Sequence, residues 1–345
     1  MSTAQAIRPA LTDGYFEIRL GCFVPGAPLA CDVYLIVNNK PTLFRRRGEA
    51  FTADRLQSLA THGANKLLAP NEQREMYLAS MRKHMNDAGI AVDVKGKLIK
   101  ETAFVHLQEL FTNPNVHEVV KGTETLVTDM VQFLSGSSAA AASLLKLSAH
   151  NNYAFNHSVN VSVYAIMLVK KLNGLDPSQL VVAGLSALLH DIGKRELPAA
   201  LNLKTLPLTK EELQMMKLHP VFGEKALMGV HVTQQVKEVV AQHHENFDGS
   251  GYPRGLKGEQ ISQMARIVAI ADAFDALTTE RPGQKAFLPD EALELMASLQ
   301  PHRFDPTIFQ HFGRKGATSK LTVKLGKDFD PCSPQPIPLV SKDKT

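Results

Sequence analysis

The sequence predicts a mainly α protein, a helical bundle preceded by a small α+β N-terminal domain. Strand-like alternation of apolar and polar residues is concentrated before residue 70. Apolar residues at helical spacing, separated by helix-capping signals, fill most of the chain from there to residue 315. With 345 residues, the chain is long enough for more than one domain and a substantial core. We expect four regions, with the boundaries 1–70, 71–147, 148–315 and 316–345.

The N-terminal domain is expected to contain short strands and one helix. Residues 16–20 alternate like a half-buried strand. Two further strand-like segments, 32–37 and 42–44, flank the pair Asn38-Asn39, which is typical of a hairpin turn. Thr52 then begins a short helical pattern. No residues here have catalytic spacing, so we expect a unit for dimerisation or partner binding, or a structural spacer.

The next two regions are predicted to be helical. Residues 71–147 form a helical connecting region, in which one helix begins just before the alanine run 139–142. Residues 148–315 form the main helical domain. Residues 316–345 begin with a short alternating segment and continue as a Pro- and Lys-dotted tail, which we expect to be partly disordered.

Composition excludes several classes of protein. The formal net charge of +4 is too small and too dispersed to argue for nucleic-acid binding by charge alone, so we expect no nucleic acid polymer as a partner. The basic cluster Arg45-Arg46-Arg47 is interpreted as a solvated strand end. No run of 18 apolar residues could form a membrane span, and no signal peptide is visible. We therefore expect a cytoplasmic protein with reduced thiols at Cys22, Cys31 and Cys332.

Histidines and aspartates that could bind metal are clustered in the main helical domain. Seven of the 13 histidines fall between residues 150 and 244, and the centre of the cluster is His190-Asp191-Ile192-Gly193-Lys194. Imidazoles and carboxylates are the ligands that borderline divalent metals prefer. The sequence therefore predicts a metal site, and its candidate ligands are His157, His190, Asp191, His219, His243, His244 and Asp272.

Local signals place these ligands near the ends of helices. Asp176-Pro177 begins an apolar helix that ends at His190-Asp191, where Gly193 is expected to close it. Thr209 and Glu212 form a capping box for the helix that leads to His219.

Two further helices are expected to contribute ligands. Thr233 caps a helix whose apolar face ends with His243 and His244. Asp272 lies on a helix face of small and apolar residues, where a buried carboxylate needs a partner, and a metal is the simplest one. The alternative for any lone histidine is a satisfied core residue, and we assign that role to His150 and His231. For the whole set, a metal centre is favoured.

This stretch closely resembles the HD-GYP family, a branch of the HD-domain metal-dependent phosphohydrolases. The matching motifs come in the family's order over about half of the chain: HSVNV at 157–161, HDIGK at 190–194, His219-Pro220 with Gly223, HHE at 243–245, DGSGYPRGL at 248–256 and DAFDALTTERP at 272–282. The resemblance implies an HD-type helical bundle.

The resemblance also implies an activity. The family hydrolyses cyclic di-GMP, and some members act on cyclic GMP-AMP. It uses two or three metal ions, usually iron or manganese, while this donor set also accepts zinc and others. By position, the first metal would be held by His157, His190, Asp191 and Asp272. The second would be held by His219, His243 and His244, with Asp191 bridging the two. A bridging hydroxide would open cyclic di-GMP to linear pGpG, with slow onward hydrolysis to GMP.

Substrate contacts are implied for five residues. Lys194 is placed to contact a phosphate, although a cation at a helix C-terminus is its alternative explanation. In the loop Gly251-Tyr252-Pro253, Tyr252 either contacts the substrate or closes the loop onto the bundle. Arg281 and Lys285 are further candidates, with plain surface charge as the alternative.

Three departures from the family pattern qualify the prediction. Asn151-Asn152 replaces the acidic residue that is common just before the segment leading to His157. Tyr153 stands where three-metal members carry a Glu, which favours two metals. Arg281-Pro282-Gly283 replaces the usual Arg-Pro-Tyr and removes an aromatic ring near the substrate groove. Two alternatives to a cyclic di-GMP phosphodiesterase stay open. One is a catalytically weak module that binds a cyclic dinucleotide or, through the GYP loop or the N-terminal domain, a signalling protein. The other is a phosphohydrolase for a different ester. A homodimer is compatible with all of them.

Overall fold

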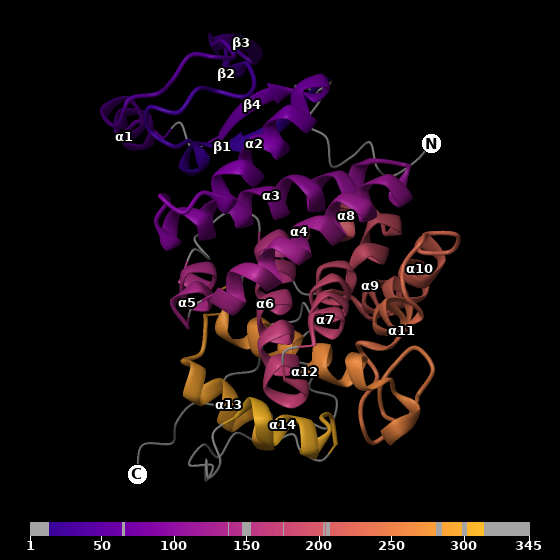
Figure 1. The fold of residues 1–345 in the computed structure, drawn as a ribbon. Helices are drawn as coiled ribbons and strands as arrows, with labels where there is room; N and C mark the ends of the chain where they lie inside the picture. Colours follow the sequence, from indigo (N-terminus) through magenta and orange to yellow (C-terminus); the bar gives the residue numbers. More distant parts are fainter. Residues whose placement is uncertain are drawn as a thin grey trace, which may run out of the picture. The chain divides into compact units, whose positions relative to one another are not determined.

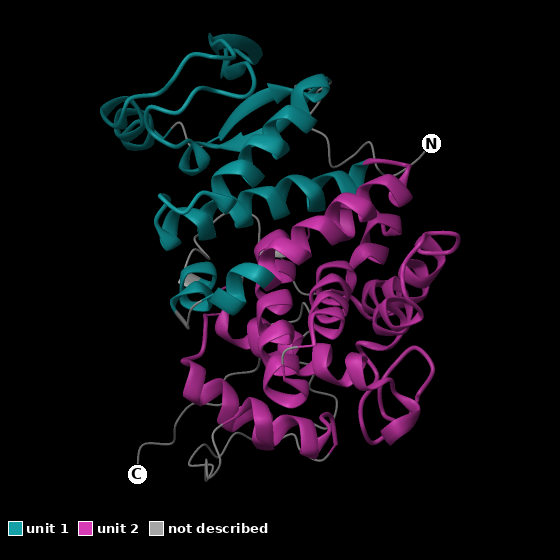
Figure 2. Cartoon of the chain, in the orientation of Figure 1, with its two compact units in different colours: residues 1–112, 132–149 teal, residues 113–131, 150–345 magenta. Residues whose placement is uncertain are grey.

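The computed structural model describes residues 14–63, 66–136, 138–146, 153–174, 176–202, 204, 208–280, 285–298 and 302–313. The described chain is mainly helical, with a small antiparallel sheet near its N-terminus, so the predicted fold class is confirmed (Figure 1). It divides into two compact units (Figure 2). Unit 1 comprises residues 1–112 and 132–149, and unit 2 comprises residues 113–131 and 150–345.

The sheet of unit 1 has the strand order β1-β4-β2-β3, and every pair in it is antiparallel. Its strands are β1 (Tyr15–Arg19), β2 (Val33–Val37), β3 (Lys40–Arg45) and β4 (Lys66–Pro70). The first three strands were predicted. The fourth was not, because Leu67 to Pro70 are all buried and therefore lack the alternation of a half-exposed strand.

The predicted local signals of this unit are confirmed. Asn38 and Asn39 have φ angles of 49° and 59° and form the turn between β2 and β3. Thr52 caps helix α1 (Ala53–Thr61), and its hydroxyl accepts a hydrogen bond from the Arg55 amide. A 3-10 helix, η2 (Leu20–Cys22), follows β1. Cys22 and Cys31 are buried free thiols.

Helices complete unit 1. They are η3 (Asn71–Gln73), α2 (Arg74–Asn86), α3 (Val92–Thr112) and α5 (Ser138–Lys146), and α3 packs against α2, α5 and β1. The helix predicted just before the alanine run is therefore present. Because α3 packs on the sheet, unit 1 joins the small sheet to helices that we expected in a separate connecting region. Helix α4 (Val116–Gly136) has residues in both units.

Unit 2 is a bundle in which α6, α7, α11 and α12 form the packed centre. Its elements after α4 are α6 (Tyr153–Asn173), α7 (Pro177–Leu189), η4 (Ile192–Glu196), α8 (Ala199–Asn202), α9 (Lys210–Met216), α10 (His219–Ala226), α11 (Gln234–Gln242), η5 (Gly258–Gln260), α12 (Gln263–Thr278), α13 (Pro289–Ser298) and α14 (Pro306–Phe312). The Asp176 cap of α7 and the capping box of α9 are both present.

Some predictions lie outside the described residues. These are the C-terminal segment 316–345 with Cys332, His150, and the Arg281-Pro282-Gly283 sequence. Among the described helices, none combines the length and the apolar character that a membrane span requires.

Candidate metal centre

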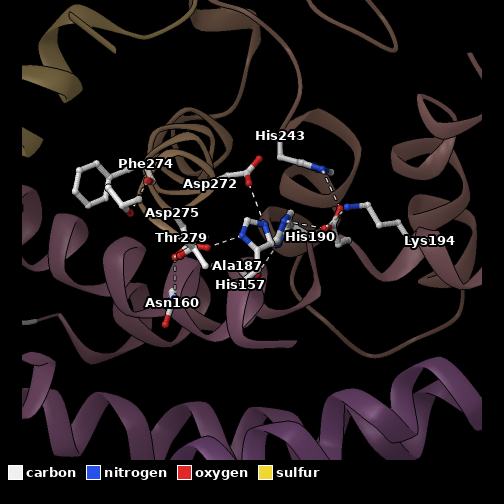
Figure 3. Close-up of polar contacts among 12 residues, drawn as sticks. His157, Asn160, Ala187, His190, Lys194, His243, Asp272, Phe274, Asp275 and Thr279 are labelled. Carbon is white, nitrogen blue, oxygen red and sulfur yellow. Dashed lines mark hydrogen bonds and ion pairs between the residues drawn. The ribbon is translucent and has the colours of Figure 1, made fainter. Parts of the chain in front are cut away.

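The structure brings all seven predicted ligands together inside unit 2, and each is at most 8% exposed. They come from five places in the bundle: His157 from α6, His190 and Asp191 from the turn after α7, His219 from the first position of α10, His243 and His244 from the residues after α11, and Asp272 from α12. Figure 3 shows the His157 ring between the carboxylates of Asp272 and Asp275, with His190 beside it.

Their donor atoms form overlapping groups of three with metal-site spacing. One group is His157, His190 and Asp272, another is His219, His243 and His244, and the third, His190, Asp191 and His243, shares a histidine with each of the others. Asp191 lies between the first two groups. Its Oδ2 is 3.4 Å from His190 Nε2 and its Oδ1 is 3.3 Å from His219 Nε2. This carboxylate therefore reaches toward both groups.

Backbone carbonyls fix the tautomers of three of these histidines. The Nδ1 atoms of His190, His219 and His243 lie 2.7, 2.8 and 3.0 Å from the carbonyl oxygens of Ala187, Met216 and Val240. Because a carbonyl only accepts hydrogen bonds, each Nδ1 donates the ring proton. Each Nε2 then keeps its lone pair and points into the centre, which is the arrangement of a metal ligand.

One contact and one unpartnered atom in the centre favour a bound cation. His219 Nε2 and His243 Nε2 are 3.0 Å apart, and with both ring protons on Nδ1 their lone pairs face each other. The buried Asp191 Oδ1 has no hydrogen-bond partner. A divalent cation would satisfy all three atoms at once. The residues present therefore fit a divalent metal ion.

Burial keeps the three histidines of the second ligand group, His219, His243 and His244, unprotonated. It lowers the pKa of His219 to about 3 and that of His243 to about 4, and it holds the pKa of His244 well below its usual value. These imidazoles are therefore neutral at physiological pH, the state that binds metal.

His157 behaves differently because two carboxylates hold it. Burial lowers its pKa, but hydrogen bonds to Asp272 and Asp275 outweigh burial and raise the pKa to about 10. Its Nε2 lies 3.1 Å from Asp272 Oδ1, and its Nδ1 lies 2.7 Å from Asp275 Oδ2. A proton between Nε2 and Asp272 occupies the place where a metal ion would bind, and metal binding would release that proton.

Asp275 is a functional residue that we did not assign from the sequence. It is fully buried, and besides His157 it accepts hydrogen bonds from Asn160 Nδ2 at 2.8 Å and Thr279 Oγ1 at 2.9 Å (Figure 3). Its position three residues after Asp272 places both carboxylates on the same face of α12, and this spacing could have revealed it. Asp275 orients His157 and raises its basicity as a ligand.

Gly193 has a different role from the one predicted. It does not close α7 in a left-handed conformation, because its φ is not positive and α7 ends with His190 in the right-handed region. A Cβ at Gly193 would instead lie 1.9 Å from the His219 carbonyl oxygen and 2.4 Å from the Gly223 amide nitrogen. The backbones of η4 and α10 are therefore in direct contact, which brings Asp191 close to His219.

The loop after His244 is fixed by a buried carboxylate and a glycine. Glu245 is 3% exposed, and its two oxygens accept hydrogen bonds from the amides of Arg254 and Leu256 at 2.7 and 3.0 Å. A Cβ at Gly251 would lie 2.2 Å from the Asn246 amide nitrogen, so only glycine fits there. We gave Glu245 no role from the sequence, because a buried acceptor for loop amides has no distinctive spacing.

Tyr252 packs this loop onto the bundle. Its amide donates to the His244 carbonyl at 3.1 Å, and its ring stacks on the His244 ring with centroids 4.7 Å apart and planes inclined by 23°. The structural role that we considered for Tyr252 is therefore present. A contact between Tyr252 and a substrate stays a prediction.

Of the three cationic residues that were predicted to contact the substrate, one lies at the centre. Lys194 lies at the edge of the centre, where its Nζ is 2.6 Å from Asp191 Oδ2 and its side chain is 32% exposed. Lys285 is exposed. Arg281 lies outside the described residues.

His231, which we expected in the core, is exposed, so that prediction was wrong.

Comparisons with known proteins agree with this architecture. A family model described as "HD domain" matches residues 127–308. The solved structure of Bd1817, an HDG"Y"P protein from Bdellovibrio bacteriovorus, superimposes with a TM-score of 0.69 and 25% identity, and the match covers 86% of this chain and 98% of that one.

Curated relatives match part of the chain by sequence. The cyclic di-GMP phosphodiesterase PA4108 of Pseudomonas aeruginosa is 39% identical over 190 residues, 54% of this chain and 45% of that protein. The cyclic di-GMP phosphodiesterase response regulator RpfG of Xanthomonas campestris is 43% identical over 141 residues, 40% of this chain and 37% of that protein. The 3'3'-cGAMP-specific phosphodiesterase 3 of Vibrio cholerae is 35% identical over 161 residues, 47% of this chain and 35% of that protein. The chain thus spans less than half the length of these relatives.

The HD-domain model matches more than half of this chain, and the HD-GYP motifs are assembled around one buried centre. The chain therefore belongs to the HD domain family, in its HD-GYP branch.

Proposed function

We propose that this protein is a metal-dependent phosphodiesterase that opens cyclic di-GMP to linear pGpG and hydrolyses pGpG onward to GMP more slowly. The observation that carries the proposal is the buried set of unprotonated Nε2 atoms around the unpartnered Asp191 Oδ1. Such a set requires cations, and it lies in a chain whose relatives are named as phosphodiesterases for cyclic dinucleotides.

The ligand set would hold two divalent ions. His157, His190 and Asp272 would bind one, His219, His243 and His244 the other, and Asp191 would be shared. When bound, such a pair acidifies a water molecule and neutralises the charge of the phosphodiester. Iron and manganese suit this imidazole and carboxylate set, which also accepts zinc. Tyr153, where a third-metal Glu would stand, supports two ions rather than three.

Lys194 would act on the substrate. Its ammonium lies 2.6 Å from Asp191 Oδ2 and is partly exposed. Once the Asp191 charge is shared with metal ions, the ammonium is available to a phosphate oxygen at the edge of the centre. A compact ammonium with three donors suits this role.

The test combines metal analysis with hydrolysis of cyclic di-GMP by anaerobically purified protein. Wild type is expected to contain about two metal ions per chain and to form pGpG. Asp191→Ala should lose metal and activity together. Asp290→Ala, which removes an exposed carboxylate of the same unit, should change neither. Wild-type protein without metal would overturn the ligand assignment, and full metal content in Asp191→Ala would overturn the sharing of Asp191.

A second candidate function is a module that binds a cyclic dinucleotide and turns it over poorly. The observation that favours it is Gly283, which replaces the tyrosine usual in the family. Two bound metals and tight binding of cyclic di-GMP without product would support this alternative. A homodimer, a signalling partner at the GYP loop or the N-terminal unit, and a cytoplasmic location remain predictions.

A further inference from the structure

Lys217 places a second ammonium group beside the centre. It directly follows α9, two residues before His219, and its Nζ lies over the Tyr252 ring, 5.1 Å from the ring centroid. Lys194 is paired with Asp191, whereas Lys217 has no carboxylate partner among the residues that the structure describes. Lys217 therefore contributes an uncompensated positive charge.

Contacts within the loop hold the Tyr252 ring beneath Lys217. The Tyr252 ring stacks on His244, its amide is bonded to the His244 carbonyl, and the close approach at Gly251 fixes the loop. The cation–π contact holds the ammonium near the ring but leaves N–H donors available to an anion.

The two ammonium groups lie at different places around the centre. Lys194 contacts Asp191, the carboxylate between the two ligand groups. Lys217 adjoins the His244 side through Tyr252. One phosphate at the metal ions would be within reach of Lys194, which leaves Lys217 for a second anionic group.

We propose that Lys217 binds the second, unreacting phosphate of a cyclic dinucleotide whose first phosphate is held at the metal ions. A cyclic dinucleotide carries two phosphodiesters in one ring, and both keep a negative charge when the ring is bound. Lys217 would thus select cyclic dinucleotides over phosphodiesters with a single phosphate. The inference rests on the proposed function and adds a specificity-determining residue to it.

The test compares Lys217→Met with wild type on two substrates, cyclic di-GMP and bis(p-nitrophenyl) phosphate, which has a single phosphate. We expect the KM for cyclic di-GMP to rise about tenfold, the effect of one charge-assisted contact, with little change in kcat. The kinetics on bis(p-nitrophenyl) phosphate should not change. Lys217→Arg should restore most of the affinity. Lys225→Met, which removes an exposed charge from the neighbouring helix α10, is the matched control and should behave as wild type.

Two results would overturn the inference. Equal losses on both substrates would show that Lys217 only supports Tyr252 and His244, and unchanged KM values would show that it does not contact the substrate. Equilibrium binding of cyclic di-GMP and GMP separates this inference from the proposed function. Wild type could bind cyclic di-GMP without hydrolysing it, and this result would overturn the proposed activity. The role of Lys217 would still be supported if Lys217→Met bound cyclic di-GMP about tenfold more weakly than wild type and bound GMP equally well. Absence of cyclic di-GMP binding by wild type would overturn both.

Discussion

Substitution of Gly193 by alanine should damage the metal centre without replacing any of its ligands. The added Cβ would start 1.9 Å from the His219 carbonyl oxygen, and real Cβ atoms essentially never approach closer than 3.0 Å. The two backbones must therefore separate by at least 1.1 Å, the difference between 3.0 and 1.9 Å. Because protein interiors are close-packed, this shift cannot be absorbed locally. It would move His219, the first residue of α10, away from Asp191.

The expected costs follow from this displacement. Overpacking of a core contact costs about 1–3 kcal/mol, which corresponds to a fall in Tm of roughly 2–10 °C for a domain of this size. A misplacement of about 1 Å at a reacting centre costs on the order of 100-fold in activity. Metal binding should weaken with it, since His219 and Asp191 would no longer face the same ion.

Thermal unfolding and metal titration of Gly193→Ala would check this reasoning. Gly136→Ala is the matched control, because a Cβ at Gly136 has no atom within 4 Å and the residue lies at the end of α4. The control should keep the wild-type Tm and metal content. A Gly193→Ala protein with the same Tm and metal affinity as wild type would refute the contact between η4 and α10 on which the argument depends.

The other predictions concern orientation, the loop and pH. Asp275→Asn should weaken metal binding about 10–100-fold, because His157 loses its charged acceptor; unchanged affinity in competition with a chelator would contradict this. Tyr252→Phe should leave metal content intact and raise the KM for cyclic di-GMP about fivefold, the effect of one lost hydrogen bond; identical kinetics would restrict Tyr252 to packing. The folded-state pKa values of His219 and His243, about 3 and about 4, lie below the ordinary value of 6.5, so the unfolded chain takes up protons first on acidification. The stability that these residues contribute to the metal-free protein is thus present above pH 6.5 and is lost as the pH falls from there toward 4. The Tm measured in EDTA should therefore fall between pH 7 and pH 5. A Tm that does not change over this range would argue against the burial of His219 and His243 as neutral rings.

Much of the site could be predicted because its parts are written locally in the sequence. Asp176, Thr209 and Thr52 are cap residues whose hydrogen bonds lie within one turn, so they identify helix starts without tertiary information. The ligands followed from residue type and from the helix faces on which they lie.

The rest depends on contacts between distant segments. Strand β4 is buried on both faces, so its sequence carries no alternation to reveal it. The role of Gly193 depends on the backbone of α10, which no local pattern shows. Glu245 accepts hydrogen bonds from amides nine and eleven residues later, a partnership set by the path of the loop. His231 was misjudged because the general tendency of a lone histidine to be a core residue does not determine which way a particular loop residue faces.

The separation of the ligands along the chain also has a consequence for folding. His157 and its orienting partner Asp275 are 118 residues apart in sequence, and the other ligands come from elements between them. Ions bound to such a set act as cross-links, because they hold together segments that are far apart in the sequence. Closing these long loops costs conformational entropy, and metal binding offsets that cost. The centre can form only after all of its helices have docked, so its assembly should be a late step of folding. Metal supply would then govern how long the protein survives proteolysis as well as whether it is active.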